Sequence, residues 1–259
     1  MNAHPSFNEA QPIDRETEEQ FFLTRRERKQ LRKKGGKKAP AKMDIKEGYA
    51  PLVAKTSTQK FYLDCLDDGS QIFAIGPAGT GKTYIPARRA AQALKRGEVK
   101  KIYIARPTIS QKRHQLGFLP GKQEQKLAPW LVPLLDAIKD EVNPKTLDTW
   151  MNEKKVEFLS FETLRGRTLR DCWVILDEAQ NCSFSDLKLF LTRKGENSVY
   201  VVTGDVDQVD IEDSGLEKIV NMIREYDLSP DLVEFSEDEC VRSEDAKEWL
   251  LAFSRASQG

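Results

Sequence analysis

A glycine-rich stretch at residues 76–83, with the sequence GPAGTGKT, carries the clearest chemistry in this chain. It matches the pattern G-x-x-x-x-G-K-[ST] and directly follows the apolar run Ile72–Ile75. In this pattern backbone N–H groups point at phosphate oxygens, the lysine approaches the β- and γ-phosphates, and the hydroxyl binds Mg²⁺. The spacing therefore predicts a phosphate-binding loop, or P-loop, between a buried strand and a helix, with Lys82 on the phosphates and Thr83 on the metal.

We expect this loop to hold ATP together with a glutamine that precedes it. The expected contacts from the loop region are Gly76, Pro77, Ala78, Gly79, Thr80, Gly81, Lys82, Thr83 and Tyr84. The side-chain amide of Gln59 can both donate to and accept from the edge of adenine, which would favour ATP over GTP. A glutamine exposed at the start of a helix is the alternative interpretation of Gln59.

Two carboxylates follow a second apolar run. Trp173–Leu176 reads as a buried strand, and Asp177 and Glu178 come directly after it. In P-loop NTPases a carboxylate at such a position holds Mg²⁺. We assign Asp177 to the metal, mainly through water, and Glu178 to the catalytic base that accepts a proton from the attacking water. An acidic strand end that merely faces solvent is the alternative.

A third apolar run, Val199–Thr203, is followed by the polar sequence GDVDQ at residues 204–208. Polar groups at the end of this strand can contact the γ-phosphate and respond to its loss. Thr203 and Gln208 are the candidates for this sensor. An ordinary surface turn is the alternative interpretation.

Arginines are the candidates for stabilising the charge that develops in the transition state, because the guanidinium group is a cation of fixed geometry. The candidates are Arg106, Arg165, Arg167 and Arg242. The sequence does not distinguish an arginine that acts within its own subunit from one that acts across an interface. For each of them a surface or ion-pair role is the alternative.

From about residue 47 onward, short apolar runs alternate with segments of helical spacing. The expected strands are Ile72–Ile75, Ile102–Ala105, Val156–Ser160, Trp173–Leu176, Val199–Thr203 and Leu232–Phe235. The expected helices are Thr83–Leu94, Gln125–Lys139, Ser185–Thr192, Leu216–Tyr226 and Ser243–Ser254. This alternation predicts an α/β fold, in which helices cover both faces of a parallel sheet and the ligand lies at the carboxyl ends of the strands.

The distribution of charge predicts a tail at residues 1–46 and a folded domain at 47–259. Of the 259 residues, 32% are charged and 39% are hydrophobic, and the formal net charge is zero. Within the tail, residues 25–42 hold ten Lys or Arg and one Glu. Such a window cannot bury its own charges, so we expect it to be disordered and mobile.

Composition disfavours a membrane protein and a zinc protein. The sequence has no run of about 18 apolar residues, and its N-terminus lacks the apolar core of a signal peptide. The four cysteines have no CxxC spacing, and only two histidines are present. We therefore expect a cytoplasmic protein that makes no contact with membranes.

Further motifs accompany the P-loop and the paired carboxylates. They are GPAGTGKTY at 76–84, ARPT at 105–108, LGFLPG at 116–121, RGRTL at 165–169, ILDEAQN at 175–181, LFLTRKG at 189–195, TGDVDQVD at 203–210, SGL at 214–216 and VR at 241–242. Together these residues resemble the PhoH family of phosphate-starvation-inducible ATPases, which is also common in phage genomes. The resemblance runs from about Thr56 to Arg242.

The resemblance implies a RecA-like P-loop NTPase domain of the superfamily 1 helicase type. The roles that it implies are adenine reading for Gln59, motif II for Asp177 and Glu178, γ-phosphate sensing for Gln208 and an arginine finger for Arg242. Such proteins are expected to form rings, most of all hexamers. In these rings an arginine of the neighbouring subunit completes each ATP site. Family members are associated with RNA binding and, when fused to a PIN nuclease, with RNA unwinding and cleavage. We expect no PIN domain before residue 47.

The chain departs from the family pattern in a basic loop that includes Lys112, Arg113 and Lys122. Together with the basic tail, this loop favours an ATP-driven remodeller of RNA or single-stranded nucleic acid, since basic groups attract phosphate backbones. One alternative is an ATPase switch or chaperone that acts on a protein partner. Another is a nucleotide-binding module with little turnover, which the full set of catalytic side chains disfavours.

Overall fold

The structure, a computed structural model, describes residues 48–107 and 123–241, with a few positions between 245 and 252. Several sequence predictions lie outside these residues: the tail at 1–46, the basic stretch at 111–122, Arg242 and most of the expected helix Ser243–Ser254.

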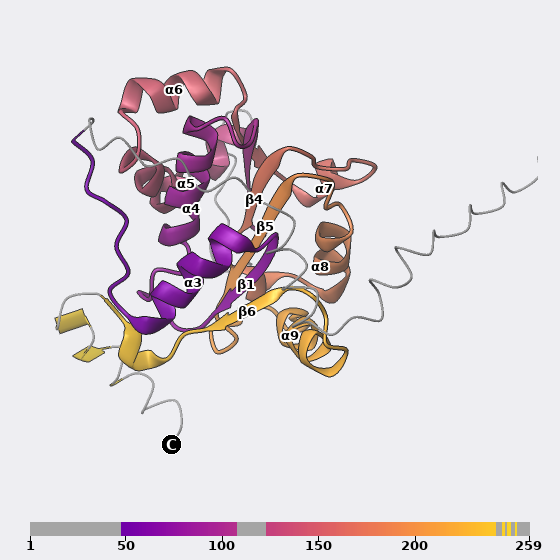
Figure 1. The fold of residues 1–259 in the computed structure, drawn as a ribbon. Helices are drawn as coiled ribbons and strands as arrows, with labels where there is room; N and C mark the ends of the chain where they lie inside the picture. Colours follow the sequence, from indigo (N-terminus) through magenta and orange to yellow (C-terminus); the bar gives the residue numbers. More distant parts are fainter. Residues whose placement is uncertain (1–47, 108–122, 242–244, 247, 250–251, 253–259) are drawn as a thin grey trace, which may run out of the picture. The chain divides into compact units, whose positions relative to one another are not determined.

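Six parallel strands form one sheet in the order β3-β2-β4-β5-β1-β6 (Figure 1). The strands are β1 (Gln71–Ile75), β2 (Lys101–Ala105), β3 (Val156–Leu159), β4 (Cys172–Leu176), β5 (Ser198–Gly204) and β6 (Asp231–Glu234). Each of them coincides with an expected strand to within one residue at either end. The predicted α/β fold with a parallel sheet is therefore confirmed.

Side chains along each strand alternate between two separate cores. In β1, Ile72 and Ala74 belong to the core on one face of the sheet, whereas Phe73 and Ile75 belong to the core on the other. All four are at most 5% exposed. Because neither face meets water, the strands appear in the sequence as continuous apolar runs rather than as alternating ones.

Helices supply the other half of each core, as Figure 1 shows. The helices α3 (Ser57–Asp68), α4 (Tyr84–Lys95), α5 (Gln123–Lys139) and α6 (Pro144–Asn152) cover one face. The helices α7 (Phe161–Leu164), α8 (Phe184–Leu191) and α9 (Leu216–Glu225) cover the other. Helices therefore cover both faces, as predicted. None of the helices in the described part of the chain is long and apolar enough to cross a membrane.

Capping side chains mark where two unexpected helices begin. The hydroxyl of Thr56 accepts a hydrogen bond from the N–H of Gln59 at the start of α3. The side chain of Asn143 accepts one from the N–H of Thr146 at the start of α6, whose first residue is Pro144. Such side chains satisfy N–H groups that have no partner within the helix.

Strand β5 lies between the two strands whose ends carry the predicted chemistry. The P-loop follows β1, the paired carboxylates follow β4, and β5 pairs with both strands. Neighbouring strands are about 4.8 Å apart, so the ends of β1 and β4 are roughly 10 Å apart. Thr203 and Gly204, at the end of β5, consequently lie between the P-loop and the carboxylates.

A buried ion pair joins α4 to the chain after α5. The guanidinium of Arg88 contacts the carboxylate of Glu141 at 2.5 Å, and the two side chains are 4% and 3% exposed. Gln92 donates to the same carboxylate at 2.8 Å, and Arg88 also donates to the carbonyl oxygen of Ala50 at 2.5 Å. This cluster therefore anchors the segment that precedes α3.

We expect Glu141→Ala to lower the free energy of unfolding by about 3–5 kcal/mol, because the charge of Arg88 would stay buried without its partner. Glu98→Ala is the control: Glu98 pairs with Arg96 at 3.2 Å on the surface, and its loss should cost less than about 1 kcal/mol. Urea unfolding followed by circular dichroism measures both. Equal losses in the two variants would contradict the importance of the buried pair.

Candidate nucleotide-binding site

The P-loop leaves β1 through a position that only glycine can occupy. Gly76 has φ +142°, and a Cβ atom there would lie 2.5 Å from the carbonyl oxygen of Phe235. Its N–H donates to the carbonyl oxygen of Gly204 at 3.1 Å. The start of the loop is therefore held against the last residue of β5 and the residue that follows β6.

Helix α3 holds the carbonyl groups of the loop. The amide nitrogen of Gln59 donates to the carbonyl oxygen of Thr80 at 2.9 Å, and the hydroxyl of Tyr62 donates to that of Lys82 at 3.0 Å. Burial raises the pKa of Tyr62, so the hydroxyl keeps the proton that it donates. In a trans peptide the next N–H points opposite to the carbonyl. The N–H groups of Gly81 and Thr83 therefore point away from α3.

The ammonium group of Lys82 lies over its own loop. It donates to the carbonyl oxygen of Pro77 at 2.9 Å, and the Thr80 hydroxyl donates to the same oxygen at 3.0 Å. This position places a positive charge beside the backbone that is expected to bind phosphates, as an anion site requires.

A hydroxyl of the P-loop meets the first of the paired carboxylates across β5. Thr83 donates to Oδ1 of Asp177 at 2.8 Å, and Thr203, at the end of β5, donates to the same oxygen at 2.8 Å. Asp177 is 5% exposed, which excludes a carboxylate that merely faces solvent. Carboxylate and hydroxyl oxygens are ligands that Mg²⁺ accepts, usually with several waters, so these residues fit the ion.

Glu178 has an unusual backbone conformation, with φ 55° and ψ 42° in the left-handed region. For a residue other than glycine this costs of order 1–3 kcal/mol, and such strain concentrates at functional sites. Its carboxylate is held on both oxygens: Arg106 contacts Oε1 at 3.2 Å, and Gln180 donates to Oε2 at 2.6 Å. The carboxylate is therefore oriented rather than loose in solvent.

Of the arginine candidates that the structure describes, Arg106 is the one that reaches this site. It lies just beyond β2 and contacts Asp177 at 3.5 Å as well as Glu178. Arg167 instead pairs with Glu157 at 3.8 Å, and Arg165 is exposed at the end of α7.

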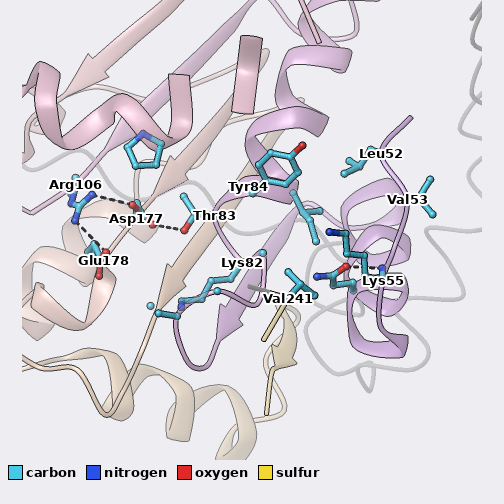
Figure 2. A pocket seen from close by; sticks show the side chains of 17 residues that line it. Leu52, Val53, Lys55, Lys82, Thr83, Tyr84, Arg106, Asp177, Glu178 and Val241 are labelled. Atoms are coloured by element: carbon cyan, nitrogen blue, oxygen red, sulfur yellow. Dashed lines mark hydrogen bonds and ion pairs between the residues drawn. The ribbon is translucent and has the colours of Figure 1, made fainter. Parts of the chain in front are cut away.

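The P-loop, Arg106 and the two carboxylates line a cavity of about 490 Å³, a volume in the range of small-molecule sites. In Figure 2 the polar side chains of Thr83, Arg106, Asp177 and Glu178 lie at one end. Leu52, Val53 and Lys55 lie at the other end, with Lys82 and Tyr84 between the two groups. This arrangement matches a nucleotide, which has a polar triphosphate and a flat, largely apolar base.

A family model described as "PhoH-like protein" matches residues 51–254. The chain belongs to this family. A PhoH-like protein of Mycobacterium leprae is 43% identical over 176 residues, which make up 67% of this chain and 50% of that protein. Protein PhoH of Escherichia coli K12 is 37% identical over 210 residues, 79% of this chain and 59% of that protein. The chain thus spans about half to three-fifths of the length of these relatives.

Among solved structures, the DUF1998 helicase MrfA bound to DNA aligns with a TM-score of 0.43 at 13% sequence identity. The alignment covers 77% of this chain and 30% of the helicase chain.

Two predicted nucleotide contacts have other partners in this PhoH-like chain. Gln59 is 4% exposed, so the alternative of an exposed glutamine is wrong. Its oxygen accepts from the N–H of Lys55 at 2.8 Å while its nitrogen supports Thr80, and the amide thus holds the P-loop. The hydroxyl of Tyr84 donates to Asp140 at 2.8 Å, and its ring lines the cavity. Adenine reading by Gln59 stays a prediction.

The predicted γ-phosphate sensors differ in their surroundings. Thr203 is fully buried and bonded to Asp177. Gln208 is exposed in the turn after β5, where its N–H donates to the carbonyl oxygen of Asp205 at 3.2 Å, and it does not line the cavity. Sensing by Gln208 therefore stays a prediction.

Sequence reasoning assigned no role to three contributors to the site. The first is the set Leu52, Val53 and Lys55, which line the cavity, and the second is Val241, whose N–H donates to the carbonyl oxygen of Gly79 at 3.0 Å. The third is Asp205, which is 4% exposed. Burial raises the pKa of Asp205, against the opposing effects of the Asp207 N–H and the charge of Lys82. A polar residue directly after a buried strand was the available signal for Asp205.

If Gln59 supports the P-loop rather than the base, Gln59→Ala should weaken the binding of ATP and GTP by a similar factor of about 10. A buried carbonyl left without its donor costs about 1–3 kcal/mol, whichever base is bound. Titration with fluorescent ATP and GTP analogues measures both affinities. A loss confined to ATP would identify Gln59 as the adenine reader. As control, Gln92→Ala removes an amide of similar burial that bonds to Glu141 and does not line the cavity, and it should leave both affinities unchanged.

Proposed function

We propose that this PhoH-like chain binds ATP with Mg²⁺ and hydrolyses it to ADP and phosphate. The observation that supports this most strongly is the 2.8 Å contact between the Thr83 hydroxyl and the Asp177 carboxylate, in a cavity that the P-loop also lines. In P-loop NTPases these two groups hold one Mg²⁺ ion between them. The cavity also has an apolar end that suits the base.

Each polar group of the cavity has a distinct part in binding. Lys82 and the loop N–H groups would hold the phosphates, and Thr83 and Asp177 would hold Mg²⁺. When bound, Mg²⁺ neutralises charge on the β- and γ-phosphate oxygens. The hydroxyl of Thr203 fixes one oxygen of Asp177 through its 2.8 Å hydrogen bond, so that the carboxylate is oriented in advance.

Glu178 is the proposed acceptor of the proton released in hydrolysis. The oxygen of a water molecule forms a bond to the γ-phosphorus while the bond to the β,γ-bridging oxygen breaks, and ADP leaves with that electron pair. The proton of the water passes to the Glu178 carboxylate. Arg106, between the two carboxylates, lowers their mutual repulsion.

We further propose that this chain forms a ring, a hexamer, and that ATP turnover in the ring drives the remodelling of RNA or single-stranded nucleic acid. The basic stretches at 25–42 and 111–122 support this, because lysine and arginine attract phosphate backbones without reading sequence. Arg242 is the proposed arginine finger, and it directly follows Val241, whose N–H bonds to the P-loop. The four cysteines are free thiols, as a reducing cytoplasm would keep them.

Two variants should separate binding from chemistry. Lys82→Ala should weaken ATP binding more than about 100-fold and abolish turnover, since it removes charge-assisted hydrogen bonds to the phosphates.

Glu178→Gln should bind ATP within about threefold of the wild type and lose turnover by at least roughly 100-fold, since only the proton acceptor is removed. Calorimetric titration and a phosphate-release assay measure the two quantities. Unchanged turnover in Glu178→Gln would reassign the base.

The nucleic-acid role has its own test. We expect single-stranded RNA to raise the ATPase rate at about 50 mM salt, and the effect to fall steeply at about 200 mM, because binding through phosphates releases counterions. Single-stranded DNA of the same length tests the preference for RNA. A polyanion without bases, such as heparin, is the control for non-specific attraction. An unchanged rate at low salt would favour the protein-partner alternative.

A further inference from the structure

We infer that Gln180 is a positioning residue, which joins the start of the P-loop to the catalytic base through one continuous chain of hydrogen bonds. The inference rests on the proposed function, because it concerns the orientation of Glu178 during hydrolysis. Gln180 lies in the short 3₁₀ helix η1 (Ala179–Asn181), between β4 and α8, and it is 2% exposed. A buried amide needs partners for both its oxygen and its nitrogen.

The two ends of the Gln180 amide have partners of opposite kinds. Its nitrogen donates to Oε2 of Glu178 at 2.6 Å, and its oxygen accepts from the N–H of Asp205 at 3.1 Å. A backbone N–H can only donate and an ionised carboxylate can only accept, so these partners determine which end is oxygen and which is nitrogen. Neither a glutamate nor an apolar side chain could serve both partners.

A single peptide group extends this connection to the P-loop. The carbonyl of Gly204 and the N–H of Asp205 belong to the same planar unit, and they point in opposite directions. The carbonyl accepts from the N–H of Gly76 at 3.1 Å, and the N–H donates to Gln180. Each hydrogen bond in this chain therefore has its donor on the side of Gly76 and its acceptor on the side of Glu178. In such an arrangement neighbouring hydrogen bonds polarise one another.

Packing around Gly204 reserves the space for this amide. A Cβ atom on Gly204 would lie 3.0 Å from the Gln180 oxygen and 2.6 Å from Cδ2 of Leu216. A side chain at Gly204 would therefore clash with Leu216 and would also crowd the Gln180 oxygen. The contact explains why β5 ends in glycine beside the cavity.

Arg106 and Gln180 act differently on the same carboxylate. Arg106 brings a positive charge to Oε1 and also contacts Asp177, whereas Gln180 is neutral and links Oε2 to the end of β5. A shift of the first P-loop residue would thus pass through Gly204 and Gln180 to Glu178. In this way the phosphate loop sets the orientation of the base.

Replacing Gln180 by methionine keeps its approximate volume and removes both hydrogen bonds. We expect kcat to fall about 10- to 100-fold, as small misplacements of catalytic groups do, while KM and the Kd of a non-hydrolysable ATP analogue change less than about threefold. Gln92→Met is the matched control. Gln92 is a glutamine of similar burial that donates a hydrogen bond to Glu141. It should leave kcat unchanged. Unfolding curves exclude loss of folding as the cause.

A second measurement does not depend on turnover. The amide of Asp205 loses its acceptor in Gln180→Met, so its hydrogen exchange should become at least about tenfold faster than in the wild type or in Gln92→Met. An unchanged exchange rate would overturn the hydrogen-bond chain. This measurement tests the hydrogen-bond chain even if the wild type hydrolyses no ATP. Absence of hydrolysis would refute the proposed function and would leave the hydrogen-bond chain standing.

A double-mutant cycle tests whether Gln180 acts through Glu178. In a Glu178→Gln background, Gln180→Met should cause no further loss of the residual single-turnover rate, because residues that act as a unit are not additive. An additive loss would show that Gln180 acts elsewhere. If the wild type hydrolyses ATP and Gln180→Met has full kcat, the inference fails while the proposed function stands.

Discussion

The hydroxyl of Thr83 and the carboxylate of Asp177 meet at 2.8 Å, although they follow strands that are not neighbours. This contact spans the end of β5, so it depends on the order β4-β5-β1 and on the register of the three strands. In that register Ile75 lies opposite Gly204, and Leu176 lies opposite Val202. The two cores maintain the register, because a slip of one residue would move each side chain from the core that it packs into to the core on the opposite face. The chemistry of the cavity therefore rests on the packing of the sheet beneath it.

Each of the two carboxylates in the cavity has a positive charge or a hydrogen-bond donor beside it, which stabilises its negative charge. Asp177 and Glu178 are adjacent in sequence, and Arg106 contacts both of them. The Thr203 and Gln180 side chains add neutral donors to these carboxylates. Lys82 lies on the loop itself, where the phosphates of a nucleotide would bring further negative charge. Donors already in place at such groups need no rearrangement during the reaction.

Sequence reasoning was most successful where one physical cause dominates. Strands buried on both faces become continuous apolar runs, and all six were found with nearly correct bounds. Helices α3 and α6 were missed, because their start signals Thr56 and Asn143 were not used. The type of residue at Gln59 and Glu178 suggested chemistry, but each side chain also contacts a partner distant in sequence, Thr80 for Gln59 and Arg106 for Glu178, which only the fold brings near. Gln180 could not be singled out, since its role depends on a peptide group that only the fold brings near.

The P-loop is completed by residues from the far end of the domain. Phe235 packs against Gly76, and the N–H of Val241 bonds to Gly79, more than 150 residues later in the chain. Contacts between such distant residues close a long loop of chain, which makes them slow to form. A growing chain on the ribosome therefore carries the whole glycine-rich motif long before the loop can take its final shape. The loop can therefore take its final shape only after β6 has joined the sheet and Val241 has reached Gly79.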